Sequence, residues 1–375
     1  MPTWVPTPNT WVPTPNRMLR LPLMSAPPAR LELALAPTPI LKLDRLSRRL
    51  GVEVHVKRDD LTGLLESGNK VRKLEFLVGE ALQQGADTLI TCGPPDSNGC
   101  RAVAAVAARL GLHAVLAIRG ERPAVYDGNL LLARLLGADT RYHPELGPEP
   151  GPELGPEVAL EPGAGVMEAL AAEVRARGGR PYVIPESGAG ELGALGYIEC
   201  AVELSEQIHH GAPRFDTIVI TSGSGGSHAG LLMGKQLAGL PGEIVSVPVT
   251  APAARVREAI VRTVGAAIQR FGFAIEVPKA IHLLDGYQGA GPAAATDEEL
   301  GAIVTLAREE GLLLDPIYTA KGFRGLVETL ARDPKALGQR VCFIHTGGVF
   351  GLFPLRDRLS RLQGEAQPKA SRADT

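Results

Sequence analysis

The sequence predicts an α/β fold in which largely parallel sheets are flanked by helices and divided between two lobes. Short apolar or β-branched runs alternate with longer segments of helical periodicity along most of the chain. The 375 residues, 45% hydrophobic and 21% charged, suffice for one large or two medium domains and exclude a mostly disordered protein. Nine strand–helix units are too many for one compact sheet of modest width. Two sheets are therefore expected, with a ligand cleft between them.

Each predicted element follows from a local pattern. The predicted strands are apolar runs bounded by turn residues, and they cover residues 52–56, 88–91, 114–118, 182–184, 217–221, 244–249, 281–284 and 341–344. The predicted helices carry an apolar face, and they cover residues 70–84, 100–110, 128–136, 166–177, 194–208, 226–237, 253–270, 297–310 and 321–331. A strand followed by a helix, many times over, indicates parallel strands with helical crossovers.

Three segments have biased composition. Residues 3–9 read TWVPTPN and residues 10–16 repeat the same seven letters, so an extended, disordered tail is expected over 1–16. Residues 144–165 are rich in Pro, Gly and Glu and are expected to form a surface loop. Residues 361–375 are expected to form a second tail.

Composition excludes several classes of protein. Lys plus Arg total 39 against 41 for Asp plus Glu. This near-neutral balance does not indicate the basic surface that a nucleic-acid-binding protein needs. No apolar run approaches the ~20 residues of a membrane span. The four cysteines have no CxxC spacing and favour a reducing compartment, hence a cytoplasmic location; they are Cys92, Cys100, Cys200 and Cys342. Asp59 and Asp60 lack companions at ligand spacing, so no metal is expected.

A glycine-rich loop is the strongest local signal. Residues 221–230 read TSGSGGSHAG, directly after an apolar strand and directly before a helix. Backbone amides converging at a helix N-terminus predict a phosphate site, and a flexible glycine turn is the alternative. The residues expected to bind the phosphate are Ser222, Gly223, Ser224, Gly225, Gly226 and Ser227.

Two further helix starts could carry chemistry. Lys70 lies in the first turn of a predicted helix, where the dipole opposes its charge and should lower its pKa, as a Schiff-base lysine requires. A solvated surface lysine is the alternative. In PPDSNG, Ser97 and Asn98 could hold a carboxylate at a helix start, or serve as an ordinary N-cap.

The motifs together resemble a known family. They are KRDDLTG at 57–63, SGNKVRKLE at 67–75, DSN at 96–98, SGSGGSHAG at 222–230, LLLDPIYTAKG at 312–322 and FIHTGG at 343–348. In this order they resemble the pyridoxal 5′-phosphate enzymes that include D-cysteine desulfhydrase and 1-aminocyclopropane-1-carboxylate deaminase, from about residue 30 to residue 355.

The resemblance implies a tryptophan-synthase-like fold (fold type II), pyridoxal 5′-phosphate as cofactor, a small amino acid as substrate and a homodimer. It places a larger cofactor lobe at 17–68 and 187–360, and a smaller lobe at 69–186 that contains Lys70 and the 144–165 insertion.

The resemblance also implies roles for single residues. Lys70 matches the lysine that binds the cofactor covalently and later moves the substrate's α-proton. Lys73 and the 222–227 loop match the phosphate-binding positions. Asn98 matches the asparagine that bonds the cofactor's 3′-oxygen, and Ser97 matches the serine that faces the substrate carboxylate.

The second half of the chain supplies the remaining matches. Tyr318 matches a tyrosine near the pyridine ring, and Tyr287 matches a second active-site tyrosine. Thr346 and Gly347 match the loop that closes this side of the site.

The residue after Tyr318 separates the two activities. Deaminases of the family typically carry Glu there, which keeps the pyridine nitrogen protonated, whereas this chain has Thr319. A hydroxyl would leave the nitrogen closer to neutral and favour β-elimination. The resemblance therefore implies a desulfhydrase-like lyase that releases pyruvate, ammonia and sulfide or another leaving group.

Two departures from the family pattern affect the substrate. Asp96 and Gly99 flank the Ser-Asn pair where the family usually has Gln and His or Gln, and residues 187–191 read SGAGE in place of Gly-Gly-Ser-Asn. An ionised Asp96 would repel a substrate carboxylate, so a bulkier or amine-bearing amino acid is one alternative, and a helix-capping Asp96 is another. Deamination, β-replacement, racemisation and a non-catalytic binding role stay open.

Overall fold

The computed structural model describes residues 28–65, 67–146, 163–289 and 295–364. The repeat within the 1–16 tail, most of the 144–165 insertion and most of the 361–375 tail lie outside these ranges. The larger sheet has six strands in the order β1-β2-β10-β7-β8-β9, and all neighbours are parallel except β1 and β2. Its strands are β1 (Ile40–Lys42), β2 (Glu53–Lys57), β7 (Thr217–Ser222), β8 (Glu243–Pro248), β9 (His282–Leu283) and β10 (Arg340–Ile344).

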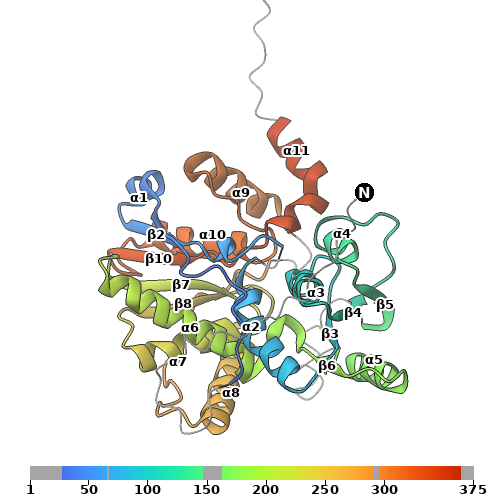
Figure 1. The fold of residues 1–375 in the computed structure, drawn as a ribbon. Coiled ribbons are helices and arrows are strands. Elements are labelled where there is room, and N and C mark those ends of the chain that lie inside the picture. Colours follow the sequence, from blue (N-terminus) through green and yellow to red (C-terminus); the bar gives the residue numbers. More distant parts are fainter. Residues whose placement is uncertain (1–27, 66, 147–162, 290–294, 365–375) are drawn as a thin grey trace, which may run out of the picture.

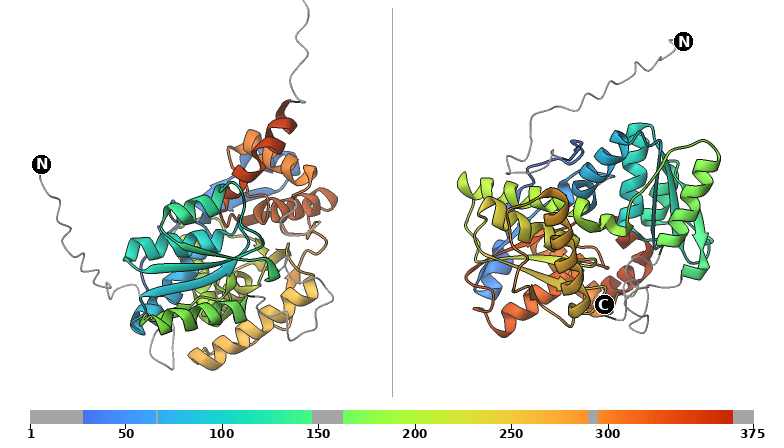
Figure 2. Two further views of the ribbon diagram at one scale, coloured as in Figure 1. Left: turned by 90° about the vertical axis from the view of Figure 1, so that its right-hand side faces the viewer. Right: turned by 90° about the horizontal axis from the view of Figure 1, so that it is seen from below.

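A second, all-parallel sheet has four strands in the order β5-β4-β3-β6. Its strands are β3 (Thr88–Gly93), β4 (His113–Arg119), β5 (Asp139–His143) and β6 (Pro181–Val183). The two sheets lie beside each other, with helices around both of them (Figures 1 and 2). The predicted α/β class is confirmed.

The helices occupy the segments between the strands. They are α1 (Asp44–Leu50), α2 (Asn69–Gln83), α3 (Asn98–Leu110), α4 (Gly128–Leu135), α5 (Ala164–Ala176), α6 (Gly190–His209), α7 (Gly226–Ala238), α8 (Ala253–Phe271), α9 (Asp297–Glu310), α10 (Thr319–Arg332) and α11 (Arg356–Gly364). Every predicted strand and helix is present, with shifts of a few residues at the ends.

Four elements escaped prediction because each lacks a strong pattern. Strand β1 has three residues, and β5 reads DTRYH with no fully buried position. Helix α1 reads DRLSRRL, and α11 reads RDRLSRLQG. The limits of the 144–165 loop also need correction, because Pro144–Leu146 form a 3-10 helix and α5 begins at Ala164.

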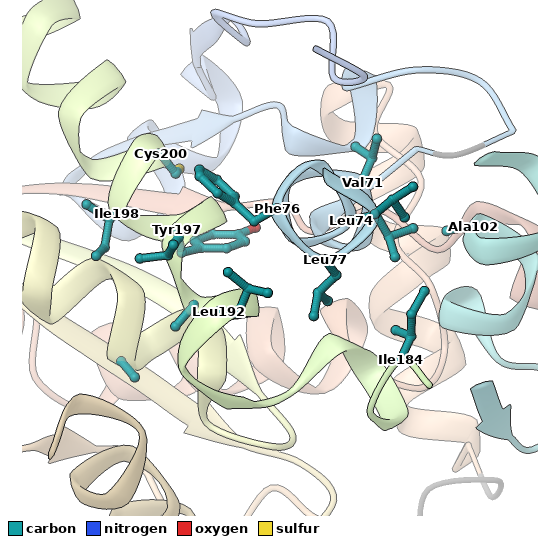
Figure 3. Packing of buried hydrophobic residues seen from close by; sticks show 14 of the residues in the cluster. Val71, Leu74, Phe76, Leu77, Ala102, Ile184, Leu192, Tyr197, Ile198 and Cys200 are labelled. Carbon is teal, nitrogen blue, oxygen red and sulfur yellow. The ribbon is translucent and has the colours of Figure 1, made fainter. Parts of the chain in front are cut away.

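Helix α2 lies between the two sheets and packs on both sides. In Figure 3, Tyr197 and Ile198 of α6 lie on one side of α2, and Ala102 and Ile184 lie on the other. The approach of α6 requires glycine at position 196, because a Cβ there would lie 2.3 Å from the backbone oxygen of Arg72. One continuous core therefore fixes α2 against both sheets.

A buried ionic network also holds α2. Arg72 donates to Oδ1 of Asp59 at 2.8 Å and to Oε2 of Glu203 in α6 at 2.9 Å. Lys57, at the end of β2, donates to the other oxygen of Glu203 at 2.6 Å. Since these charges are paired, the network fixes the rotation of the helix that carries Lys70.

We propose that the two sheets mark two lobes, 17–68 with 187–360 and 69–186. All strands of the larger sheet come from the first pair of ranges, and all strands of the smaller sheet come from the second range. The N-terminus of α2 lies at the boundary, which puts Lys70 where the lobes meet.

Candidate active site

The site forms where strands of both sheets end and helices begin. The N–H of Asn69, at the start of α2, donates to the backbone oxygen of Thr346 at 3.0 Å, just after β10. Gly68 is required there, because its φ is 98° and a Cβ would lie 2.5 Å from that oxygen. Gly347 packs closely against Gly68, since a Cβ on Gly347 would lie 2.8 Å from the Cα of Gly68. The loop after β10 therefore fixes where Lys70 stands.

Lys70 lines a small cavity together with Gly99 and Ser187. Burial lowers the pKa of its amine to about 8, against the opposing effect of the negative charges of Glu186 and Asp315. The expected lowering is confirmed, and burial is its largest cause. A substantial fraction of this amine is consequently neutral near physiological pH.

Lys73 lies one turn further along α2 and is 1% exposed. Its Nζ has a single long contact, 3.4 Å to the backbone oxygen of Ser187, and no carboxylate partner among the described residues. Burial lowers its pKa strongly, and the charge of Lys70 lowers it further. A buried cation without an anion is costly, so this position is built for an anionic ligand.

The glycine-rich loop supplies the other side of that anion site. Strand β7 ends at Ser222, Gly225 has a φ of 80°, and α7 begins at Gly226. A Cβ on Gly226 would lie 3.2 Å from Nζ of Lys73, so the loop and the lysine share one space. The hydroxyls of Thr221 and Ser222 are buried without a partner in the part of the chain that the structure describes.

These unsatisfied groups fit the phosphate of pyridoxal phosphate. A helix N-terminus, a buried ammonium group and free hydroxyl donors are the groups that bind a phosphate monoester. The groups are therefore compatible with a bound phosphate, and the amine of Lys70 lies one helical turn away from them.

Asn98 is oriented by a chain of side chains. Arg101, which can only donate, donates from Nε to Oδ1 of Asn129 at 2.7 Å. The Nδ2 of Asn129 must therefore donate, and it donates to Oδ1 of Asn98 at 3.0 Å and to the backbone oxygen of Asp96 at 2.6 Å. The amide nitrogen of Asn98 is therefore the end that can donate to a further partner, such as an anionic oxygen.

Ser97 is the N-cap of α3 in this structure. Its Oγ accepts from the N–H of Cys100 at 3.1 Å. A Cβ on Gly99 would lie 3.5 Å from Oγ of Ser97 and 3.8 Å from Cα of Ser187, at ordinary van der Waals distances. Burial, together with a smaller effect of the Asp315 charge, raises the pKa of the Asp96 carboxyl to about 6, against the lowering effect of a backbone hydrogen bond.

Tyr318 and Thr319 begin α10 on the far side of the site. Nζ of Lys70 lies 6.0 Å from the centroid of the Tyr318 ring, and a Cβ on Gly223 would lie 3.4 Å from that ring. Thr319 is fully buried and donates to Oδ1 of Asp315 at 2.6 Å. The ring of Tyr318 thus stands between the lysine and the glycine loop.

The structure does not bring Tyr287 to this group. Its hydroxyl donates to Oε2 of Glu328 at 3.2 Å and accepts from Arg332 at 2.9 Å, both in α10. A Cβ on Gly325 would lie 3.2 Å from its ring, so the ring packs on the same helix. Tyr287 is thus held by α10 through its hydroxyl and its ring.

Sequence reasoning missed four residues of the site. Asp315 stands in a quoted motif, DPIYT, but nothing in the sequence indicates that its side chain turns back onto the helix start. Arg101 and Asn129 belong to no motif. Glu186 pairs with Arg119 and accepts from the Cys92 thiol at 3.6 Å, a contact that depends on the packing of β3, β4 and the loop after β6.

The fold and the site together define a pyridoxal-phosphate enzyme of fold type II. Residues 31–347 match the family described as "Pyridoxal-phosphate dependent enzyme", and the chain belongs to that family. Its cofactor is pyridoxal 5′-phosphate. Within the described residues, no helix is long and apolar enough to cross a membrane.

Several known proteins are similar over most of the chain. A putative 1-aminocyclopropane-1-carboxylate deaminase of Pyrococcus abyssi is 39% identical over 87% of this chain and 93% of its own. A D-cysteine desulfhydrase of Serratia proteamaculans is 39% identical over 86% of this chain and 95% of its own. The crystal structure of an ACC deaminase homologue is 35% identical and superposes with a TM-score of 0.78 over 89% of this chain and 96% of its own.

A more distant structure agrees in fold. The L-serine ammonia-lyase of the fungus Rhizomucor miehei is 19% identical, with a TM-score of 0.60 over 89% of this chain and 99% of its own.

Proposed function

We propose that this protein is a lyase that eliminates a β-substituent from a small amino acid, in the manner of D-cysteine desulfhydrase. The products are pyruvate, ammonia and the leaving group, which is sulfide when the substrate is cysteine. The observation that carries this choice is Thr319, a hydroxyl residue at the position where the resemblance gives deaminases a Glu.

Four single residues and the 222–227 loop would hold the cofactor. Lys73 and the 222–227 loop would bind its phosphate, because the lysine is a buried cation without an anion and the loop opens a helix. The amide nitrogen of Asn98 would donate to the 3′-oxygen of the cofactor, because the amide oxygen of Asn98 already accepts a hydrogen bond from Asn129. Tyr318 would pack near its ring, and Lys70 would bind it covalently.

When bound, pyridoxal phosphate withdraws electrons from the substrate's α-carbon and acidifies the proton there. Neutral Lys70 Nζ takes that proton, and the pKa of about 8 leaves enough of the amine unprotonated to do so. The electron pair of the broken C–H bond forms the Cα–Cβ double bond, and the β-substituent leaves with the pair of its own bond. The 2-aminoacrylate released tautomerises and is hydrolysed to pyruvate and ammonia.

The substrate carboxylate would lie at the N-terminus of α3, beside Ser97 and Gly99. The free backbone N–H groups of this helix start favour an anion. Thr346 and Gly347 would close the opposite side, since they contact the start of α2. Asp96 lies at the same helix start, so the ionisation of this carboxyl tunes which amino acid binds.

We also propose a cytoplasmic homodimer. Cys92, Cys100, Cys200 and Cys342 are all buried and unpaired, which suits a reducing compartment. The dimer rests on the family resemblance, and light scattering of the purified protein tests it.

Spectroscopy combined with product analysis tests the function. The visible absorption band of the purified protein should be lost in Lys70→Ala and kept in Lys42→Ala, which alters a half-exposed lysine on β1. The wild-type protein is then given D- and L-amino acids with β-leaving groups, and pyruvate and sulfide are assayed. Pyruvate and sulfide from cysteine of one chirality support elimination. Spectral shifts without pyruvate would point to replacement, racemisation or binding alone, and pyruvate-free release of 2-oxobutyrate from 1-aminocyclopropane-1-carboxylate would point to the deaminase.

A further inference from the structure

Ser187 has an unusual backbone conformation. Its φ is 61° and its ψ is 13°, and within the described ranges it is the one residue other than glycine with a positive φ. An L side chain is strained in this left-handed region because its Cβ crowds the following carbonyl oxygen, whereas glycine adopts the region without that cost. Strained residues of this kind cluster at active sites, where the strain serves the function.

The surrounding structure holds the turn that contains Ser187. The carboxylate of Glu186 pairs with Arg119 at the end of β4. Helix α6 packs directly on the other end of the turn, because a Cβ on Gly193 would not fit beside the backbone oxygen of Gly188. Contacts on both sides therefore fix the position of Ser187 in its strained conformation.

The hydroxyl of Ser187 is available to a ligand. Ser187 lines the same cavity as Lys70 and Gly99. A Cβ on Gly99 would lie 3.8 Å from the Cα of Ser187, so the start of α3 and this turn face each other across the cavity. Within the described residues the hydroxyl has no hydrogen-bond partner, while the backbone oxygen of Ser187 accepts from Nζ of Lys73 at 3.4 Å. The turn thus brings an unengaged hydroxyl to the cavity of the reactive lysine.

We propose that Ser187 is a specificity-determining residue that binds the β-substituent of the substrate. The inference rests on the proposed function, in which Lys70 takes the α-proton, the start of α3 binds the carboxylate and the substrate's amine faces the cofactor. The β-substituent is then the group that lies against the remaining wall of the cavity, which Ser187 forms.

The chemistry of a hydroxyl selects the substituents that fit. A hydroxyl donates one hydrogen bond and accepts two. A β-hydroxyl or a β-thiol satisfies it, whereas an alkyl substituent would bury it without a partner and weaken binding. The substrates are therefore amino acids whose β-substituent forms hydrogen bonds, such as serine and cysteine.

A comparison of serine with alanine isolates this contact, because the two amino acids differ only in the β-hydroxyl. Each enantiomer is added to the holoenzyme, and the initial shift of the visible absorption band gives its Kd. We expect the wild type to bind serine more tightly than alanine. In Ser187→Ala, this preference should fall about fivefold, which is the factor that one neutral hydrogen bond supplies.

Ser187→Gly separates the hydroxyl from the backbone strain. The preference for serine should fall as it does in Ser187→Ala, because both changes remove the hydroxyl. The urea midpoint of Ser187→Gly should lie above that of Ser187→Ala, because glycine adopts a positive φ without strain. A serine preference that survives in Ser187→Gly would contradict the proposal.

Ser205→Ala is the matched control. The Ser205 hydroxyl, in α6, donates to the backbone oxygen of Ala238 at 3.1 Å, and its loss should leave the serine preference unchanged. An unchanged preference in Ser187→Ala would overturn the proposal, as would equal affinities of the wild type for serine and alanine or no spectral shift with either. An equal loss of affinity for both amino acids in Ser187→Ala would also overturn it, because Ser187 would then bind a group that they share. Since binding is measured and not turnover, a failure to release pyruvate would refute the proposed elimination and leave this test intact.

Discussion

Nδ2 of Asn129 donates to Oδ1 of Asn98 at 3.0 Å, and this bond sets which end of the Asn98 amide faces the site. Asn129→Leu would remove this bond and the bond from Nε of Arg101, and it would let the Asn98 amide rotate. We expect cofactor affinity to fall about tenfold, because a lost buried hydrogen bond costs about 1–3 kcal/mol. Titration of the apoenzyme with pyridoxal phosphate measures the effect.

Gln236→Leu is the matched control. This amide in α7 also donates to one backbone oxygen, that of Glu276 at 2.9 Å, but it is exposed. Its affinity for the cofactor should equal that of the wild type. Unchanged affinity in Asn129→Leu would show that Asn98 is oriented by other contacts.

The Lys73→Met substitution should stabilise the apoenzyme and weaken its binding of the cofactor. Lys73→Met removes a buried cation that has no carboxylate partner among the described residues, so the free energy of unfolding of the apoenzyme should rise. The same change removes a charged donor to the phosphate, and cofactor affinity should fall about 100-fold. Urea unfolding and cofactor titration measure the two effects.

Lys321 provides the comparison for this prediction. It is equally buried, but its Nζ donates to the backbone oxygen of Gln288 at 3.1 Å. Lys321→Met should destabilise the apoenzyme, because it breaks a satisfied contact. A destabilised Lys73→Met apoenzyme would contradict an anion site at Lys73.

The contact between α2 and α6 predicts a loss of stability at Gly196. A Cβ there would lie 2.3 Å from a backbone oxygen of α2, which cannot move without moving the helix that carries Lys70. Gly196→Ala should lower the free energy of unfolding by about 1–3 kcal/mol, as overpacking does. Gly265→Ala in α8 has open space and should raise it by about 0.5–1 kcal/mol through helix propensity. Equal effects of the two changes would contradict the tight contact.

The order of strands and helices could be predicted because each strong element has its own periodicity. The glycine loop and the start of α2 could be identified for a similar reason, since their residues stand together in the chain. Lys73 follows Lys70 by one helical turn, so helical geometry alone predicts that the two side chains lie on the same face of the helix.

Contacts that join distant segments could not be predicted. Asn129 and Asn98, which form a hydrogen bond, are 31 residues apart in the chain. Tyr287 and Glu328 are 41 residues apart, and their hydrogen bond depends on the packing of the 284–289 loop on α10. The hydrogen bond between Thr319 and Asp315 also depends on tertiary geometry, because a carboxylate four residues earlier in the chain could equally have faced solvent. The sequence therefore identifies the residue types of the site better than it identifies their protonation.

Asp96 should make substrate affinity depend on pH. Burial raises the pKa of its carboxyl to about 6, so it is mostly neutral below pH 6 and mostly negative above it. If the substrate carboxylate lies at the start of α3, the ionised Asp96 repels it, and KM should rise several-fold as the pH increases from 5 to 7. Asp96→Asn should keep the low KM across this range, because it retains the shape without the charge. Initial rates at fixed ionic strength measure both profiles. A KM that instead falls as the pH rises would show that Asp96 binds a cationic group, and the preferred substrate would then be an amino acid with a second amine.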